Sequence, residues 1–599
     1  MPTVHSMSFR LHLAFLLLAA LPAITSARQP NVIVIFTDDH GYADLSCQDI
    51  RSDIRTPNID RLAEQGVRMT SGYVTAPQCV PSRAGLLSGR YQNRFGVESN
   101  GESLVGFNEQ VTLPERLQRT GYVTGMIGKW HLGPAQEIVR HGFDDVFYQG
   151  GSWTNFDIDG NDVSPGTTFK QLYHLDAKSA AAKAFINRHS DEAFFLYLAY
   201  RAPHVPLDAT QKYLSRFPGE MPERRRQALA MMSAVDDGVG GILDTLAEHG
   251  LEKQTLIFFI GDNGAPLKIH KIDAPGGGPG WDGSLNEPLN GEKGMLSEGG
   301  IRVPFVVHWP GTIPAGGIDD RPVISLDVAA TAIAVAGLDR DQELDGVNLI
   351  PFLDGSNQSS PHEELYWRWV AQSAIRRGNW KYLRGGDREY LFNLDVDDEE
   401  LHNVAKQNPE VASQLRAKLE DWTATLSPPG LATRPMSSTW SSYFDHYLDG
   451  KPIARPQPND RRATSVKGWI ARNGQLERRG NVLRVVPDKR NAPFIACSKL
   501  KLPSESTTVI RFRSTTTGRG GIAWRERGQN DFPAGQAVRF DVENTSSQQI
   551  YRVPIPASAP IIHLRLLLPN GVSEIASITV ENKDGEVMQD WTFDGSPLE

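Results

Sequence analysis

Short, nearly continuous apolar runs alternate with polar loops and helical segments from residue 31 onward. The clearest of these runs lie at 31–36, 122–127, 194–198, 255–260 and 303–307. Because the runs lack alternating polar positions, we expect strands that are covered by helices on both faces. Thr56-Pro57 and the later Gly66 are the start and stop signals of a helix over 56–66. The pattern predicts an α/β domain.

The pattern changes after about residue 355. Segments 374–383 and 389–394 resemble a hairpin pair, and a helix is expected from 409 to 426, which together make a small antiparallel sheet with one helix. Strands and turns alternate in the last part of the chain, as in a β-sandwich. The expected organisation is a signal peptide (1–27), a catalytic α/β domain (28–355), the small sheet and helix (356–426), a Pro/Ser/Arg-rich linker or wrapping segment (427–462) and a β-sandwich accessory module (463–599).

The first residues resemble an export signal. Arg10 precedes the apolar run 11–21, and small residues continue to Ala27, where we expect cleavage. The run is short for a membrane span, although a retained N-terminal anchor is the alternative, and no other stretch approaches about 18 apolar residues. We therefore expect a secreted or periplasmic protein without a membrane anchor.

Composition and charge exclude some classes of function. The 599 residues carry a net charge of -9, and 22% of them are charged, which is ordinary for a soluble globular protein. Without a basic stripe, a nucleic-acid partner is not expected. Only Cys47, Cys79 and Cys497 occur, too few for a scaffold held together by disulfides.

Polar side chains follow several of the predicted strands. They are Asp38 and Asp39 after the first, Lys129 and His131 after the second, His204 after the third, and Asp262 and Asn263 after the fourth. Because ligands bind beyond the carboxyl ends of strands in open α/β sheets, these residues can converge. An Asp-Asp pair by itself is more often a turn or a helix cap.

Three converging carboxylates would repel one another by roughly 4 kcal/mol per close pair at an effective dielectric near 20. They therefore either stay apart or surround a divalent cation. The donor atoms of this set are all oxygens, which favours a hard ion over zinc. Ca²⁺ is favoured over Mg²⁺ because it accepts several carboxylates without strict octahedral geometry.

The most specific segment is Cys79-Val80-Pro81-Ser82-Arg83, which is followed by Ser88-Gly89-Arg90. Here the chain resembles the type I sulfatases of the alkaline-phosphatase-like superfamily. The resemblance implies an α/β fold with a large mixed sheet flanked by helices. It also implies that a formylglycine-generating maturation enzyme oxidises Cys79 to formylglycine, whose hydrated aldehyde is the nucleophile. A structural role for this cysteine is the alternative.

The resemblance spans about residues 30–425 and assigns a role to each site residue. The implied metal ligands are Asp38, Asp39, Asp262, Asn263 and the formylglycine at position 79. The implied catalytic residues are Arg83, which orients the hydrate, Lys129 and Lys293, which meet the negative charge of the sulfate, His204, which protonates the leaving oxygen, and His131, which removes a proton so that sulfate departs. Lys293 stands in Gly-Glu-Lys-Gly, a pattern of the family.

The expected substrate is a sulfated carbohydrate, either a polysaccharide or its oligosaccharides, although a small aryl sulfate is an alternative. Four residues are candidates for substrate contact, with aromatic packing as the competing explanation for the tryptophans: His270, Trp281, Trp153 and Arg368. The β-sandwich either binds carbohydrate or braces the catalytic domain. Two rival functions are a phosphodiesterase or phosphonate hydrolase of the same superfamily, and a non-catalytic carbohydrate-binding protein in which Cys79 stays unoxidised.

Overall fold

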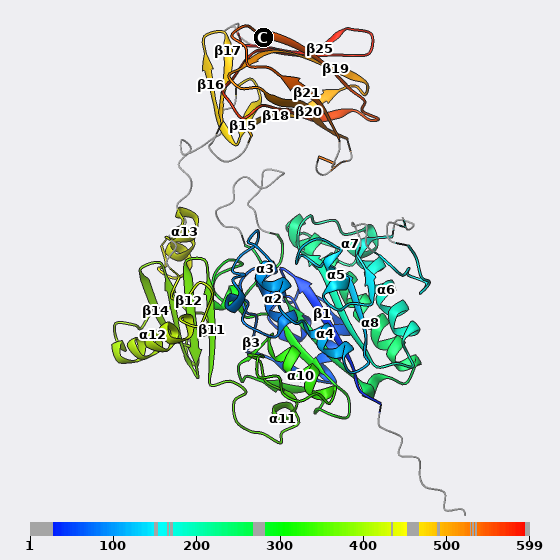
Figure 1. Cartoon of the computed structure of the whole chain (residues 1–599), viewed down its shortest axis with the longest axis vertical. Coiled ribbons are helices and arrows are strands. Elements are labelled where there is room, and N and C mark those ends of the chain that lie inside the picture. The colour runs from blue at the N-terminus through cyan, green and yellow to red at the C-terminus, as the bar shows by residue number, and fades with distance from the viewer. Residues whose placement is uncertain are drawn as a thin grey trace, which may run out of the picture. The chain divides into compact units, whose positions relative to one another are not determined.

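The computed structural model describes residues 28–148, 154–164, 167, 172–267, 282–432, 435–451, 466–487, 492–527, 529, 532–533 and 536–593. The chain separates into two compact units, residues 1–453 and 454–599 (Figure 1).

An eight-stranded mixed sheet forms the centre of the first unit, as the sequence predicts. Its strands, in spatial order, are β5 (Asp145–Phe147), β4 (Val123–Gly128), β6 (Phe194–Pro203), β1 (Asn31–Asp38), β7 (Thr255–Gly261), β8 (Phe305–His308), β2 (Val67–Met69) and β9 (Gly317–Asp319). The first five are parallel to their neighbours, whereas β8 runs antiparallel to both β7 and β2. The parallel strands therefore place their carboxyl ends at one edge of the sheet.

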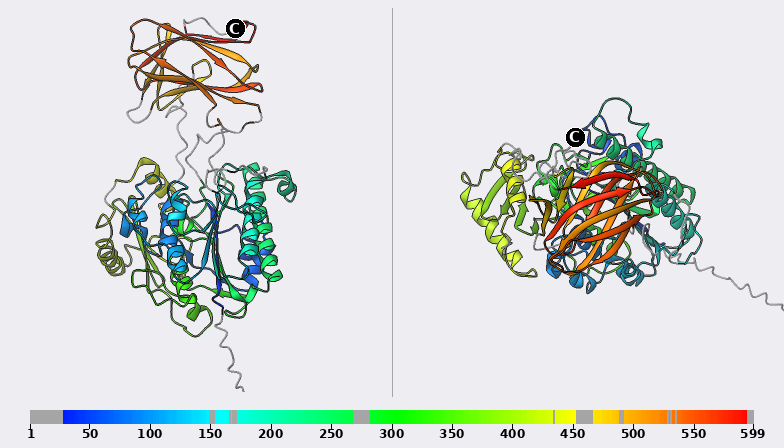
Figure 2. Two further views of the ribbon diagram at one scale, coloured as in Figure 1. Left: turned by 45° about the vertical axis from the view of Figure 1, so that its right-hand side comes forward. Right: turned by 90° about the horizontal axis from the view of Figure 1, so that it is seen from above.

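Two hydrophobic cores lie on opposite faces of this sheet. Along β1, Val32, Val34 and Phe36 belong to one core, and Ile33 and Ile35 belong to the other. This alternation is the two-residue period of a strand that is buried on both faces. Figure 2 shows the sheet between its two layers of helices.

The helices of these layers have the following bounds. The core that contains Ile33 and Ile35 is shared with α1 (Pro57–Glu64), α6 (His174–Arg188) and α8 (Glu223–Glu248). The opposite core is shared with α2 (Cys79–Ser88), α4 (Leu113–Gln118) and α10 (Asp327–Val335). Shorter helices are α3 (Val105–Asn108), α5 (Glu137–Arg140), α7 (Gln211–Leu214), α9 (Glu298–Ile301) and α11 (Ile350–Leu353), and β3 (Gly72–Tyr73) pairs with β10 (Val323–Ile324).

A four-stranded antiparallel sheet forms the small subdomain. Its strands are β11 (Glu364–Trp369), β12 (Gln372–Arg377), β13 (Trp380–Gly385) and β14 (Arg388–Asn393), and α12 (Pro409–Thr423) packs on it. The expectation of one strand over 374–383 is wrong. Gly378 has φ +54 there, a left-handed conformation that turns the chain back, so the segment forms the two strands β12 and β13.

The segment 427–462, predicted as a linker or a wrapping segment, contains a further helix, α13 (Ser438–Tyr447). Its aromatic side chains recur at positions 440, 443, 444 and 447, the spacing of one helix face. Phe444 is fully buried and its ring lies 5.8 Å from that of Tyr390 in β14. The described part of this segment is thus packed into the first unit.

The second unit consists of two antiparallel sheets around one hydrophobic core. One sheet has the order β15 (Trp469–Arg472), β18 (Phe494–Leu502), β23 (Ile561–Leu567), β20 (Gly518–Glu526) and β21 (Ala537–Val542). The other contains β16 (Gly474–Arg479), β17 (Val482–Pro487), β24 (Ser573–Glu581), β19 (Ser506–Ser514) and β22 (Gln549–Ile555), with β25 (Val587–Thr592) paired to β24. Residues of both sheets share the core, so the predicted β-sandwich is confirmed.

Two further expectations concern membranes and cysteines. Within the described ranges, no helix combines the length and the apolar character that crossing a bilayer requires. The thiols of Cys47, Cys79 and Cys497 are all free. The first unit therefore depends on its hydrophobic cores rather than on disulfides.

Candidate functional site

Polar side chains converge where the parallel strands end. Asp38 is the last residue of β1, Asp262 follows β7, Lys129 follows β4, and His204 follows β6. Asp39 has φ +60, a left-handed conformation that aspartate tolerates better than most residues. This turn brings the Asp39 amide N–H to Oδ1 of Asp262 at 3.0 Å. Adjacent strand ends thus supply one cluster, as the sequence predicts.

Cys79 is the first residue of α2 and is buried. Its Sγ lies 3.5 Å from Oδ1 of Asp38 and 3.2 Å from Nζ of Lys293. Pro81 is tolerated because it stands in the first turn of the helix, where the backbone N–H groups have no intrahelical partner. The helix N-terminus also favours negative charge at this point. The position suits a residue that reacts with an anion.

Arg83 stands one helical turn after Cys79 and therefore shares its face of α2. Its guanidinium is fully buried, donates to Oδ2 of Asp262 at 2.7 Å and lies 3.7 Å from Oδ1 of Asp38. It also stacks over the ring of Phe36 at 5.2 Å. The arginine thus ties α2 to the ends of β1 and β7.

Two lysines neutralise the acidic strand ends. Nζ of Lys129 donates to Oδ2 of Asp38 at 2.6 Å, and Nζ of Lys293 donates to Oδ1 of Asp39. Burial would lower the pKa of Lys293, but the carboxylate of Asp39 outweighs it and raises this pKa well above its usual value. Both ammonium groups consequently stay charged and remain available to an anionic substrate.

The carboxyl groups differ in their electrostatic surroundings. Burial alone would raise the pKa of Asp38, but the neighbouring cations, Lys129 foremost, hold it well below its usual range. Burial and the carboxylate of Asp38 raise the pKa of Asp262 to about 6, although Arg83 opposes the shift. Further positive charge beside these carboxylates would stabilise their ionised forms.

The arrangement fits a divalent cation. One ligand atom from each of Asp38, Asp39, Cys79 and His204 lies within 4.8 Å of the others. Nδ2 of Asn263 donates to Oδ1 of Asp39 at 2.7 Å, whereas Oδ1 of Asn263 is buried and has no hydrogen-bond donor within the described ranges. An orphaned buried oxygen beside carboxylates is a ready ligand for a hard cation.

The two histidines occupy different places at the site. Nδ1 of His204 lies 2.6 Å from the carbonyl oxygen of Val205 and donates to it, which leaves Nε2 facing Asp39 at 3.7 Å. His131 has φ +61, and its ring still reaches solvent. Partial desolvation and the cationic side chain of Lys129 lower the pKa of His131, which keeps its imidazole neutral and able to accept a proton.

The loop that carries Lys293 is held by residues that the sequence analysis missed. The Gly294 N–H donates to the carbonyl of Pro77 at 2.9 Å, close to Cys79 in the chain. Trp440 of α13 packs against Gly294 so closely that an added Cβ would lie 2.0 Å from its ring. Tyr447 in the same helix donates to Oε1 of Glu292 at 3.0 Å. The helical spacing of the aromatic residues in 440–447 is the signal that could have revealed this helix.

The predicted substrate contacts have mixed outcomes. His270, Trp281 and Trp153 lie outside the described residues. The assignment of Arg368 to substrate is wrong. Its side chain is buried in a pairing with Glu98, and it also donates to the carbonyls of Pro428 and Gly430. These partners occupy its donors, so Arg368 stabilises the fold instead.

Comparison with known proteins gives the family. A family model described as Sulfatase matches residues 30–338, and one described as N-sulphoglucosamine sulphohydrolase, C-terminal, matches residues 291–425. Helix α13 lies beyond both matches. Arylsulfatase D of Homo sapiens is 29% identical over 460 residues, which covers 60% of this chain and 74% of that protein.

Two further relatives agree with this. N-acetylgalactosamine-6-sulfatase of Canis lupus familiaris is 31% identical over 399 residues, covering 61% of this chain and 73% of that protein. The crystal structure of Ps i-CgsB in complex with k-i-k-neocarrahexaose is 32% identical with a TM-score of 0.59, covering 71% of this chain and 98% of that one. Since the sulfatase family model spans half of the sequence and includes most of the converging residues, this protein belongs to the sulfatase family of the alkaline-phosphatase-like superfamily and is a sulfatase.

Proposed function

We propose that this sulfatase removes sulfate from a sulfated carbohydrate, with a formylglycine made from Cys79 as the nucleophile and Ca²⁺ as the metal. The observation that carries the proposal is the position of Cys79. Its side chain begins a helix, lies within 3.5 Å of Oδ1 of Asp38 and within 3.2 Å of Nζ of Lys293, and shares a buried site with the candidate metal ligands. A hydrated formylglycine supplies one hydroxyl for attack on sulfur and a second through which the enzyme is released.

The cationic side chains bind and orient the sulfate group. A sulfate ester carries one negative charge, and more develops on the leaving oxygen as the S–O bond breaks. Lys129 and Lys293 offer charged donors inside a largely buried site, where such interactions are stronger than in water. Through its buried ion pair with Asp262, Arg83 holds helix α2, and with it residue 79, next to this carboxylate.

The metal ligands of the proposal are Asp38, Asp39, Asp262, Asn263 and the modified residue 79. Bound Ca²⁺ would supply a Lewis acid at the sulfate oxygens and favour ionisation of the attacking hydroxyl. The ligand oxygens, including the orphaned Oδ1 of Asn263, favour Ca²⁺ over Mg²⁺ because they come from several carboxyl and amide groups rather than from water.

The two histidines carry protons in opposite directions. Nε2 of His204 faces the site and is the proposed donor to the departing sugar oxygen, since Nδ1 is held by the carbonyl of Val205. His131, neutral because of its lowered pKa, is the proposed acceptor of the proton that must leave before sulfate is released. The pair thus supplies the acid and the base of one turnover.

The carbohydrate class is supported by the relatives. One is named for N-acetylgalactosamine-6-sulfate, and the similar crystal structure contains a neocarrahexaose. We therefore place sulfated galactose-type sugars first among the candidates, ahead of an aryl sulfate. We also propose export with cleavage near Ala27, to the periplasm or outside the cell, and oxidation of Cys79 by a formylglycine-generating enzyme, both of which rest on the sequence.

Two measurements test the nucleophile and the substrate together. Mass spectrometry of the peptide that spans Cys79 should show conversion of the thiol to an aldehyde. Purified enzyme should then release sulfate from neocarra-oligosaccharides or from N-acetylgalactosamine-6-sulfate faster than it releases phosphate from matched phosphate esters. An unmodified Cys79 in active protein, or faster phosphate release, would contradict the proposal.

Removal of metal tests the ion without depending on turnover. Because a ligand that binds only the folded state stabilises it, Ca²⁺ should raise the melting temperature of chelator-treated enzyme, by the equivalent of about 2.7 kcal/mol at 100 times its Kd. Mg²⁺ should raise it less. The Asn263→Ala variant should need more Ca²⁺ for the same shift, whereas an equal response in that variant would rule out Oδ1 of Asn263 as a ligand.

A further inference from the structure

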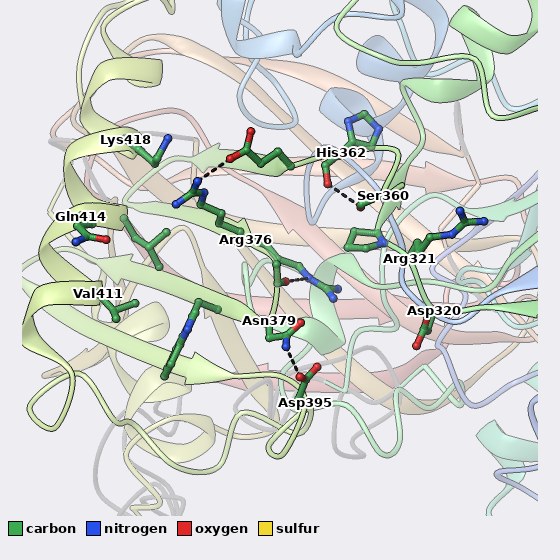
Figure 3. Close-up of a pocket in the computed structure, with 16 residues that line it drawn as sticks. Asp320, Arg321, Ser360, His362, Arg376, Asn379, Asp395, Val411, Gln414 and Lys418 are labelled. Atoms are coloured by element: carbon green, nitrogen blue, oxygen red, sulfur yellow. Dashed lines mark hydrogen bonds and ion pairs between the residues drawn. The ribbon is translucent and has the colours of Figure 1, made fainter. Parts of the chain in front are cut away.

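A cavity of about 640 Å³ lies in the small subdomain, outside the catalytic site. This volume is within the range of small-molecule sites, about 300–1,000 Å³. Its floor is the β12–β13 turn, one wall is α12, and the other wall is formed by the segments 320–322 and 360–363 (Figure 3). No role in the proposed reaction uses any of these residues.

The cavity and the catalytic site lie at opposite ends of β12. Gln372, at the first end, donates to the carbonyl of Gly294 and accepts from the N–H of Leu296, so this end touches the loop of Lys293. Arg377, at the other end, lines the cavity. Arg377 is five positions beyond Gln372, which corresponds to about 17 Å at about 3.3 Å per residue. A ligand in the cavity consequently lies away from the reacting sulfate.

Arg376 is the distinctive residue of this cavity. Its side chain is 8% exposed, and Figure 3 shows it between the residues of the two walls. Its hydrogen bonds go to neutral groups, the carbonyl of Gly378 and the hydroxyl of Tyr73. Within the described ranges it forms no direct ion pair, and the carboxylate that its charge acts on, Glu298, is hydrogen-bonded to the same Tyr73 hydroxyl. A buried guanidinium normally has a carboxylate in direct contact, because an unpaired buried charge is costly.

The other cations of the lining are already paired. Arg321 binds Asp319, Arg377 binds Glu363, and Lys418 binds Glu364. The lining carboxylates are similarly occupied, since Asp395 accepts from Asn379 and Glu363 pairs with Arg377. Asp320 is exposed, where water screens its charge. Arg376 is therefore the lining cation that an incoming anionic group can neutralise.

The remaining lining residues suit a sugar. Trp380, half-buried at the β12–β13 turn, also lines the cavity, as do the exposed residues Asn379 and Gln414. An aromatic ring packs against the apolar face of a sugar, and amides hydrogen-bond to its hydroxyls. We propose that this cavity binds a segment of the sulfated glycan, with Trp380 against a sugar ring and Arg376, on the other face of the hairpin, receiving a sulfate group. This inference rests on the proposed function, because it takes the glycan as the ligand.

The first test compares a long substrate with a short one. In the Arg376→Gln and Trp380→Ala variants, kcat/KM for a sulfated polysaccharide should fall about ten-fold through KM, since charged hydrogen bonds and aromatic contacts are lost. The kcat/KM for a small aryl sulfate should stay unchanged. Arg416→Gln is the matched control, because this arginine lies in α12 and does not line the cavity. Equal losses on both substrates, or no loss on the polysaccharide, would overturn the proposal.

The second test measures binding without turnover. In the Cys79→Ala background, calorimetric titration with a sulfated neocarrahexaose should detect two sites per chain, and addition of Arg376→Gln should remove one. A single site in both proteins would overturn the proposal, and so would equally tight binding of the desulfated sugar at the second site. An enzyme that hydrolyses no sulfate ester but keeps both sites would disprove the proposed function alone.

Discussion

Two buried arginines of the first unit show how differently the same side chain can be used. Arg83 in the catalytic site and Arg376 in the cavity of the small subdomain are both nearly inaccessible, and each stacks on an aromatic ring, Phe36 and Tyr73 respectively. Each also donates to a tyrosine hydroxyl. They differ in their anionic partners, because Arg83 contacts two carboxylates whereas Arg376 contacts only neutral groups.

Burial therefore does not reveal the role of a charged residue, but its pairing does. The charge of Arg83 is neutralised inside the protein, so this arginine holds α2 and the strand ends in position. Arg376 has no direct ion pair and reaches Glu298 only through the Tyr73 hydroxyl, so its guanidinium can still bind an external anion. Substitutions at four positions or pairs of positions test this contrast and the site around Arg83.

The largest effect should come from Cys79→Ala, which removes the proposed nucleophile but none of the ion pairs around Arg83. Turnover should fall at least about a thousand-fold, and the melting temperature should change little. Cys47→Ala is the control, because Cys47 lies outside the site and its free thiol has no role in the mechanism. Unchanged sulfate release by Cys79→Ala would disprove the nucleophile.

The second prediction contrasts the two arginines in stability. Arg83→Gln leaves Asp262 buried without its cation, so the free energy of unfolding should fall by about 3–5 kcal/mol. Arg376→Gln loses hydrogen bonds to neutral groups but no direct ion pair, while Glu298 keeps Lys381, so the change should cost about 1 kcal/mol. Urea unfolding of both variants at pH 7 gives the comparison. Equal losses would show that the pairing of Arg83 does not set its role.

The third prediction concerns pH and the buried cluster near Arg376. Lys381 lies 2.7 Å from Oε1 of Glu298 and 2.8 Å from Oε1 of Glu400. Burial raises the pKa of Glu400 to about 7, above its usual 4.5, although Lys381 opposes the shift. In that window the folded state binds a proton more tightly than the unfolded state does, so stability should fall as pH rises from about 4.5 to about 7.

The Glu400→Gln variant isolates this contribution. Because glutamine cannot ionise, the free energy of unfolding of this variant should not show the decrease of ~3 kcal/mol that Glu400 causes in the wild type between these limits. Urea unfolding at pH 5 and pH 8 measures the difference between wild type and variant. The pKa of Glu298 is lowered to about 2, below this window, so its titration leaves the comparison undisturbed. A wild-type stability that rises with pH in parallel with the variant would refute the assignment.

The smallest effect is expected from Trp440→Ala in α13. Its ring packs on Gly294, next to Lys293, so its loss should loosen the loop and lower kcat about ten-fold with little change in KM. Trp440→Phe should recover most of the rate. Phe444→Leu is the control, since Phe444 packs on the small sheet rather than on the loop. If the control slows turnover as much as Trp440→Ala, the helix acts through general stability.

Local sequence patterns are enough to predict the class of fold and which polar residues meet at the site. Short uninterrupted apolar runs favour strands that are covered on both faces, so the buried strands follow from local pattern. The residues after each strand share one edge of that sheet because parallel strands end together. The motif around Cys79 is local as well, since a helix start with Pro81 and Arg83 one turn on needs no distant contact.

Which polar residues pair with one another depends on the three-dimensional packing of distant segments. Arg368 is of a residue type that often contacts an anionic substrate, but Glu98, 270 positions away in the chain, pairs with it and neutralises its charge. Arg376 is an arginine of the same small sheet, but it forms no direct ion pair with a described carboxylate. The packing of α13 on the loop of Lys293 also joins distant segments. A charged side chain acts according to the charges near it in space, and these long-range neighbours are set by the fold.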